Sequence, residues 1–140
     1  MEIPKYDDIK PSTDLKDEKA KEEDVYNKSL CRLYQQGNKD ALNELLEHNV
    51  EFITKYSKTY AKRSLHMYIS KINQLTYDDI ANENIIAFIE FVKRIDVNSN
   101  MPFKTLLIAL IKNNTIKILR GYSDRKLVIH TDKEVITENE

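Results

Sequence analysis

Apolar residues recur at helical spacing along most of the chain and predict four helices. These are expected over residues 27–36, 39–65 or beyond, 77–94 and 103–120. Between the first two helices, Gly37 interrupts the pattern and Asn38 is a suitable N-cap for the longer helix. The pattern therefore predicts an all-α fold, a bundle of about four helices.

Capping residues sharpen the boundaries of the last two helices. Thr76 is a candidate N-cap, with Asp79 three residues later in a capping-box arrangement. Pro102 suits the first turn of the last helix because its fixed φ angle matches a helix and its missing N–H is not needed there. Gly121 suits the residue just after the C-terminal end of that helix.

The remaining stretches are less regular. Residues 1–26 carry a net charge of −4 and few apolar side chains, so a disordered acidic tail is expected there. Residues 65–75 suit either an extension of the second helix or a short separate helix. The chain is thus divided into a tail (1–26), a helical domain (27–126) and a short C-terminal extension (127–140) that suits a short strand or helix.

Composition restricts the class of protein. A chain of 140 residues, with 41% apolar and 32% charged residues, has enough apolar content for one packed core. Its single cysteine, Cys31, argues against a disulfide framework and against a thiolate-rich zinc site. The sequence contains no apolar run long enough to span a membrane, and its first residues are too charged for a signal peptide. A cytoplasmic location is therefore expected.

Residues suited to catalysis or metal binding are sparse. His48, His66 and His130 are scattered, so neither a metal site nor a cofactor is expected. No glycine-rich loop is present to bind a phosphate. The acidic pair at 78–79 has no base or nucleophile beside it, so the chain is not expected to be an enzyme.

Charge alternates in blocks along the chain, although the formal net charge is only −1. Residues 53–72 and 104–126 each carry a net charge of +5, whereas residues 76–96 carry −3. Such blocks are either ordinary solvated helix faces or separate binding surfaces. In the second case, the basic blocks suit a polyanion and the acidic block suits a basic partner.

Several short motifs occur in a characteristic order. A helix start with paired acids, TYDDIANE (76–83), continues into FVKRID (91–96). After a polar loop, FKT (103–105) begins a basic helix that ends in ILR (118–120). Together with the upstream QGNKDAL (36–42), this order and spacing resembles region 2 of bacterial sigma factors over most of the chain. The finer likeness is to divergent sigma factors of low-GC Gram-positive bacteria.

The resemblance implies a partner for the third helix. In sigma factors, the acidic start of this helix binds the clamp coiled coil of the β′ subunit of core RNA polymerase. The matching positions in this chain are Asp78, Asp79, Asn82, Glu83, Ile85 and Ile89. Apolar side chains among acidic ones also suit a partner helix that carries basic residues. The alternative is that Asp78 and Asp79 only cap the helix.

The resemblance also implies that the last helix contacts DNA, since in sigma factors it recognises the promoter minus-ten element. The matching positions are Lys112, Asn113, Ile116, Lys117 and Arg120. An Asn side chain can pair with a base edge, while Lys and Arg neutralise phosphates. The alternative is a solvated basic face without a ligand.

The chain departs from the sigma pattern in two respects. Where sigma factors that melt promoters carry Tyr and Trp, this chain has Leu106, Ala109 and Leu110, which cannot stack on an unpaired base. Residues 97–101 would then form a base-binding loop, as in specialised sigma factors, and Phe103 is expected in the core. The stretch after Lys126 is too short for the domain that reads the minus-thirty-five element. Either a companion sigma subunit supplies that domain, or the protein works from the minus-ten side alone, or it is a regulator with a sigma fold.

Three functions remain open from the sequence. The first is a sigma-like transcription initiation subunit that binds core RNA polymerase and promoter DNA. The second is a sigma-fold regulator that binds a protein partner without promoter contact, which the missing aromatic residues favour and the basic last helix opposes. The third is a plain helical DNA-binding protein, which leaves the acidic helix start without a role.

Overall fold

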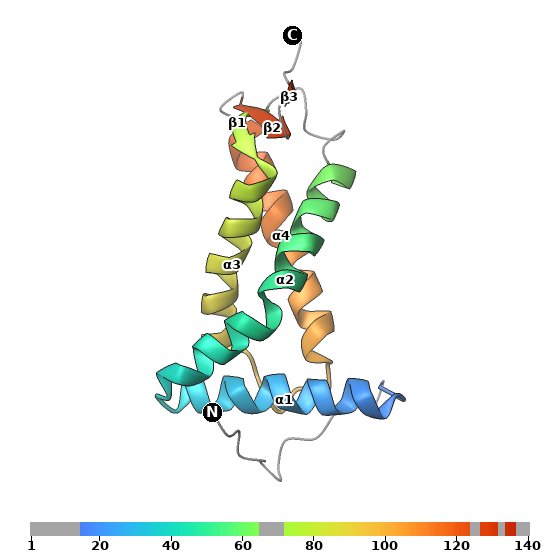
Figure 1. Ribbon diagram of the computed structural model, residues 1–140, viewed down its shortest axis with the longest axis vertical. Coiled ribbons are helices and arrows are strands. Elements are labelled where there is room, and N and C mark those ends of the chain that lie inside the picture. The colour runs from blue at the N-terminus through green and yellow to red at the C-terminus, as the bar shows by residue number, and fades with distance from the viewer. Residues whose placement is uncertain (1–14, 65–71, 124–126, 132–133, 137–140) are drawn as a thin grey trace. The chain divides into compact units, whose positions relative to one another are not determined.

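The computed structural model describes residues 15–64, 72–123, 127–131 and 134–136, with side chains described for residues 15–64 and 76–121 (Figure 1). Its elements are α1 (Glu18–Gln35), α2 (Lys39–Ser64), β1 (Ile72–Thr76), α3 (Tyr77–Arg94), α4 (Phe103–Ser123), β2 (Leu127–Thr131) and β3 (Glu134–Ile136). The predicted all-α bundle of about four helices is confirmed, and a small sheet accompanies it. Within the described residues, no helix is long and apolar enough to cross a membrane.

Helix α1 begins nine residues earlier than the sequence predicted. The predicted boundary between tail and domain, at residue 26, falls inside this helix, so the tail prediction is wrong from Glu18 onward. Asp17 is the N-cap, and its carboxylate accepts a hydrogen bond from the Lys19 amide at 3.2 Å. The rest of the predicted tail lies mostly outside the described residues. The physical reason for the longer helix is tertiary, because Asp24 and Lys28 of this charged stretch are buried.

The other helix boundaries follow the local signals closely. Gly37 adopts a φ of +102°, and the Asn38 side chain accepts a hydrogen bond from the Asp40 amide at 3.1 Å, as expected of an N-cap. Helix α3 has the predicted limits, and α4 begins directly after Pro102. The prediction for Gly121 is wrong, since α4 continues through it to Ser123 and it does not have a positive φ.

A three-stranded sheet has the order β1–β2–β3. Strand β1 pairs with β2 in parallel, with Thr76 opposite His130, and β2 pairs with β3 antiparallel, with Ile129 opposite Ile136. The helical prediction for residues 65–75 is therefore wrong at its C-terminal end, while residues 65–71 lie outside the described residues. A strand forms there because its pairing partner is supplied by a distant part of the chain, which local periodicity does not reveal.

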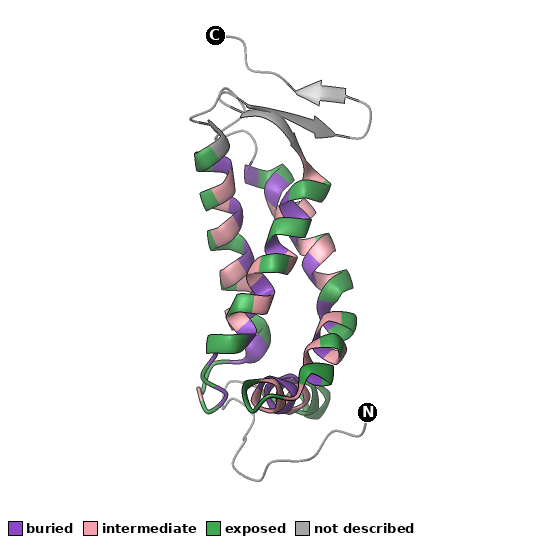
Figure 2. Cartoon of the chain, turned by 90° about the vertical axis from the view of Figure 1, so that its left-hand side faces the viewer, coloured by how far each residue is buried: buried purple, intermediate pink, exposed green. Residues whose placement is uncertain are grey.

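The chain divides into two compact units. The first consists of the described residues up to Val50 and of Phe88–Ala109, and the second consists of the described residues of Glu51–Ala87 and Leu110–Glu140. Helices α2, α3 and α4 each contribute residues to both units. Helices α2, α3 and α4 each carry buried residues along one side and exposed residues along the other (Figure 2). Helix α1 is instead buried on all sides over residues 27–31.

The core of the first unit is aromatic and aliphatic. Phe103, predicted as a core residue, is 1% exposed, and its ring lies 6.2 Å from that of Phe88 and 5.7 Å from that of Phe91. Cys31 is also fully buried in this unit, and burial raises the pKa of its thiol. The thiol is therefore kept protonated and behaves as a small apolar core residue.

Candidate functional site

The start of α3 is a capping box. The Thr76 amide donates a hydrogen bond to Asp79 Oδ2 at 3.1 Å, and the Asp79 amide donates one to Thr76 Oγ1 at 3.0 Å. The two residues thus satisfy backbone groups that an open helix end leaves without partners. Asp79 consequently has a structural role in the second unit, whatever else it contacts.

Asp78, the other acid at this helix start, faces the basic stretch of α2. Its Oδ1 lies 2.6 Å from Lys58 Nζ, and the Lys62 ammonium lies 5.4 Å from the centre of the Tyr77 ring. The Asp78 side chain remains 75% exposed, so the ion pair is at the surface. These contacts join the first turn of α3 to the C-terminal half of α2.

Beyond its first turn, α3 presents an outer face of polar and apolar side chains. Asn82 and Glu83 are exposed, and Ile85 is half-buried. Ile86, which the sequence analysis did not single out, is 58% exposed and is the most exposed large apolar side chain among the described residues. Its sequence signal was its position between Glu83 and Glu90, outside the core stripe. The remaining predicted residue, Ile89, is half-buried and belongs to the first unit.

A buried polar network positions the three helices of the second unit. The Asn84 amide of α3 donates hydrogen bonds to Ser57 Oγ of α2 at 2.8 Å and to Thr115 Oγ1 of α4 at 3.0 Å. The Asn114 amide donates in turn to Asn84 Oδ1 at 2.8 Å. Because Asn84 is fully buried, a shift of any helix along its axis would leave a polar group without a partner.

The predicted DNA-binding residues of α4 all lie in the second unit. Four of them are exposed (Lys112, Asn113, Lys117 and Arg120), while Ile116 is half-buried. The opposite side of the helix carries the core residues Ile111, Thr115 and Leu119. The network around Asn84 therefore fixes which side of α4 faces outward, and that side is the basic one.

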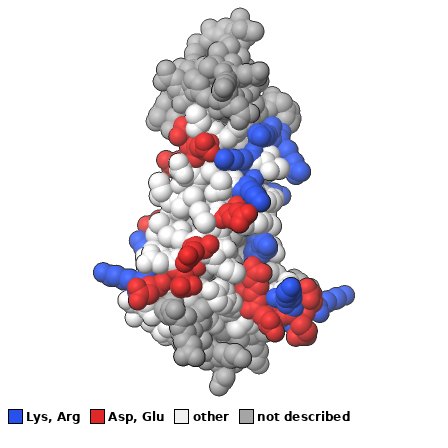
Figure 3. All heavy atoms as spheres, in the orientation of Figure 1, with Lys and Arg blue, Asp and Glu red and all other residues white. Residues whose placement is uncertain are grey.

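Helix α2 also carries a basic surface, within the charge block for which the sequence analysis considered a polyanion as ligand. Lys and Arg side chains gather over the C-terminal half of α2, and acidic side chains lie over the start of α3 beside it (Figure 3). The basic residues of this half of α2 are Lys55, Lys58, Lys62 and Arg63. Their sequence signal was the +5 net charge of residues 53–72.

In the first unit, α1 holds the loop that precedes α4. The Lys28 ammonium donates a hydrogen bond to the Ser99 carbonyl at 3.0 Å, and Arg32 donates one to Asn98 Oδ1 at 3.0 Å. Asp24 accepts a hydrogen bond from the Phe103 amide at 2.7 Å, which caps α4. The loop at residues 97–101, expected to bind a flipped base, is thus anchored from α1, and base binding by it stays a prediction.

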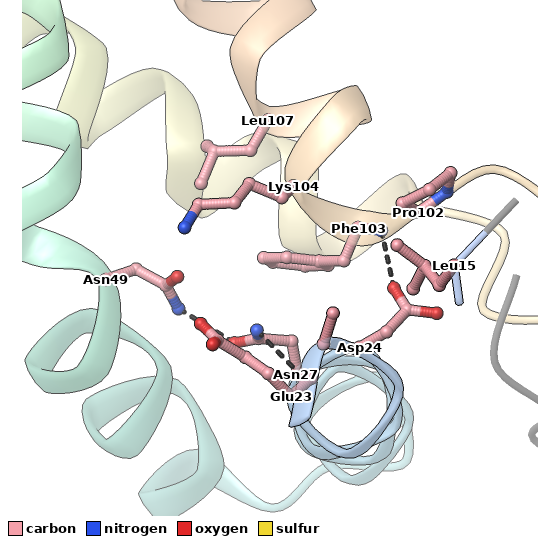
Figure 4. A pocket seen from close by; sticks show the side chains of 10 residues that line it. Leu15, Glu23, Asp24, Asn27, Asn49, Pro102, Phe103, Lys104 and Leu107 are labelled. Atoms are coloured by element: carbon pink, nitrogen blue, oxygen red, sulfur yellow. Dashed lines mark hydrogen bonds between the residues drawn. The ribbon is translucent and has the colours of Figure 1, made fainter. Parts of the chain in front are cut away.

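A pocket opens beside this anchor, between α1 and the start of α4 (Figure 4). Pro102, Phe103 and Leu107 form its apolar wall, and Asn27 and Asn49 lie on the opposite side. The Asn49 side-chain amide donates a hydrogen bond to Asn27 Oδ1 at 3.0 Å. Residues 97–101 do not line this pocket, so it is not the site at which that loop was expected to bind a base.

Metal binding finds no support in the described part of the chain. No group of three or more His, Cys, Asp or Glu side chains is placed there to hold an ion. His48 lies against the Tyr26 ring, with a centroid distance of 4.8 Å, and its Nε2 is 3.5 Å from Glu23. His66 lies outside the described residues.

Comparison with known proteins identifies no relative, because no protein family, curated protein or solved structure matches this chain.

Proposed function

We propose that this chain is a sigma-like transcription initiation subunit. Helix α3 binds core RNA polymerase at the β′ clamp coiled coil, and α4 contacts the promoter minus-ten element. The observation that carries the proposal is that the second unit exposes acidic and polar side chains on α3 and basic ones on α4 at positions that the sigma resemblance assigns to these partners. The exposed Ile86 lies beside the α3 positions.

The α3 face has the chemistry of a protein-docking surface. Ile86 is exposed in the middle of a helix, where its burial by a partner would release bound water and be favourable. Glu83 and Asn82 flank it one turn away, so they can pair with basic and polar groups at the rim. Since Asp79 is used in the capping box, we assign the main docking contacts to Glu83 and Ile86.

The α4 face has the chemistry of a phosphate-binding surface with one base-reading side chain. Lys112, Lys117 and Arg120 extend over more than two turns, and Asn113 lies among them. Cations of this kind bind the phosphate backbone, while an Asn amide can form two hydrogen bonds with adenine. This face favours the sigma-like function over the regulator that makes no promoter contact.

Polymerase binding is tested by a pull-down with purified core RNA polymerase. The double variant Glu83→Lys/Ile86→Ser reverses the charge and removes the exposed apolar side chain without touching the capping box. A matched control, Glu47→Lys/Val50→Ser, makes the same changes at the same spacing on α2, where both side chains are also exposed. We expect the wild type and the control to retain polymerase and the α3 variant to lose it. Equal retention by all three proteins would contradict the docking assignment.

The DNA contact is tested separately, without polymerase. Binding of a duplex with a minus-ten-like sequence is measured at several salt concentrations for the wild type, Lys117→Ala and the control Lys39→Ala, which removes an exposed Lys from the first turn of α2. We expect Lys117→Ala, but not the control, to reduce the magnitude of the slope of log K against log salt by about 0.9. Polymerase binding without any DNA binding would instead support the interaction regulator.

A further inference from the structure

The second unit places a tyrosine from α2 beside the basic face of α4. The Lys112 ammonium of α4 lies 5.7 Å from the centre of the Tyr60 ring. This distance is near the outer limit of about 6 Å for a cation–π contact. Lys112 is exposed and Tyr60 is half-buried, so both side chains reach the surface at this point.

Tyr60 is the last member of an aromatic row on α2. Phe52, Tyr56 and Tyr60 are spaced four residues apart and therefore follow one side of the helix. The ring centres of Phe52 and Tyr56 are 5.5 Å apart, and those of Tyr56 and Tyr60 are 6.5 Å apart. The last two rings are nearly parallel, with an angle of 16° between their planes. All three residues are half-buried, so none of them is enclosed in the core.

Positive charge surrounds the solvent end of this row. Arg63 is exposed and lies one turn after Tyr60, on the same side of α2. Lys112 approaches the ring from α4, and Arg120 lies two turns further along that helix. From residue 53 to the end of α2, the helix contains no acidic residue. Lys55 and Lys58 of this stretch pair with Glu51 and Asp78, so the cations that bear on Tyr60 are Arg63 and Lys112.

We propose that Tyr56, Tyr60 and Arg63 of α2, together with Lys112 of α4, form a surface that binds single-stranded DNA. A phosphate that pairs with Lys112 draws its ammonium away from the Tyr60 ring, and the adjacent base stacks on the ring face that Lys112 leaves. Arg63 pairs with a neighbouring phosphate. The proposal rests on the promoter contact proposed for α4 and specifies its ligand as an unpaired strand. It also supplies, from a different helix, the aromatic contact that Leu106, Ala109 and Leu110 cannot make.

Single-stranded DNA fits this surface better than an acidic protein does. Stacking on aromatic rings combined with phosphate contacts to Lys and Arg is the usual mode of binding unpaired nucleic acid. An acidic peptide would use the cations but would gain little from a row of ring faces. In a duplex the base faces are covered by neighbouring base pairs, so only an unpaired strand uses both features.

The test compares a fluorescein-labelled oligothymidylate with a mixed-sequence duplex of equal length, measured by fluorescence anisotropy. Tyr60→Leu keeps an apolar side chain of similar bulk and removes the ring, and Tyr60→Phe keeps the ring. Tyr34→Leu is the matched control, because Tyr34 is also half-buried but lies on α1. We expect Tyr60→Leu to weaken single-strand binding about 5- to 150-fold, the fold-change that corresponds to the loss of one stacked base. Tyr60→Phe and Tyr34→Leu should remain within about 2-fold of the wild type.

A second readout separates stacking from a purely structural role of Tyr60. The chain contains no Trp, so its intrinsic fluorescence comes from tyrosine. Stacking of a base on Tyr60 is expected to quench part of this emission, and Tyr60→Phe should reduce the quenching while it preserves the affinity. Unchanged quenching in Tyr60→Phe would overturn the assignment of Tyr60.

The outcomes also separate this inference from the proposed function. If Lys117→Ala weakens DNA binding but Tyr60→Leu does not, the α4 contact stands and the stacking surface is refuted. If the wild type binds the duplex as tightly as the single strand, the preference for an unpaired strand is refuted. If it binds neither DNA, both DNA assignments fail, and the pull-down still decides whether α3 binds polymerase.

Discussion

The buried ion pair of α1 offers the strongest test of the fold. Lys28 Nζ lies 3.2 Å from Asp24 Oδ2, and the two side chains are 0% and 3% exposed. The variant Lys28→Met keeps a side chain of similar length but removes the charge. It leaves the Asp24 carboxylate buried with its hydrogen bond from Phe103, and it leaves the Ser99 carbonyl without the lysine donor.

The expected cost follows from these contacts. Removal of one partner from a buried ion pair typically costs about 3–5 kcal/mol, because the other charge stays buried without compensation. We expect about 3 kcal/mol here, at the lower end, because the Phe103 amide still stabilises Asp24. For a chain of this size, that cost lowers the melting temperature by roughly 10 °C. The double variant Asp24→Asn/Lys28→Met should lie within about 1 kcal/mol of the wild type, because it removes both charges and keeps an oxygen acceptor for Phe103.

Urea unfolding followed by circular dichroism measures these differences. The control is Lys21→Met, the same substitution on the same helix, where the lysine pairs at 3.3 Å with Glu18, whose side chain is 83% exposed. A surface pair of this kind is worth well under about 1 kcal/mol. If Lys28→Met is as stable as Lys21→Met, the buried pair is refuted. Residues before 27 would then fit the disordered tail that the sequence predicted.

Three further predictions concern single positions. Asn84→Ala should lower the free energy of unfolding by about 2–4 kcal/mol, because it leaves buried hydroxyl groups without hydrogen-bond partners. The control Asn82→Ala, on the exposed side of α3, should change it by less than about 0.5 kcal/mol. Similar values for the two variants in urea unfolding would contradict the network. Gly37→Ala should destabilise the fold by roughly 1–2 kcal/mol, because Gly37 has a positive φ. Gly121→Ala should stabilise the fold by up to about 1 kcal/mol, because Gly121 lies within a helix and has open space around it. Thermal melts in which both variants shift the melting temperature in the same direction would refute this pair of predictions. Cys31, with its raised pKa and full burial, should react with a thiol reagent only after unfolding, and rapid labelling of the native protein would show that the thiol is accessible.

Local signals in the sequence were sufficient where the structure depends on neighbouring residues. The helical limits of α3 follow from apolar periodicity and from the pairing of Thr76 with Asp79, which are three residues apart. Gly37 ends the first helix because its own backbone conformation requires it. The outward direction of the basic residues of α4 was also predictable, since the apolar positions of the same helix define its buried side.

The sequence-based prediction failed where charged residues were assumed to be exposed. The pair Asp24 and Lys28 belongs to a stretch of charged residues, and no local pattern distinguishes it from its solvated neighbours. The two side chains are buried because Ser99 and Phe103, more than 70 residues away, supply their hydrogen-bond partners. Strand β1 is a similar case, because its partner strand begins at Leu127.

By itself, the sequence determined the number of helices, most of their limits and the sides that they bury, because these depend on contacts within a few residues. Only the tertiary structure decided which charged residues are buried and which side chains from different helices share a surface. The approach of Lys112 to Tyr60 is an example, since it joins residues 52 positions apart through the packing of α2 and α4. Such surfaces depend on helix packing, and a periodic pattern within one helix carries no information about its neighbours.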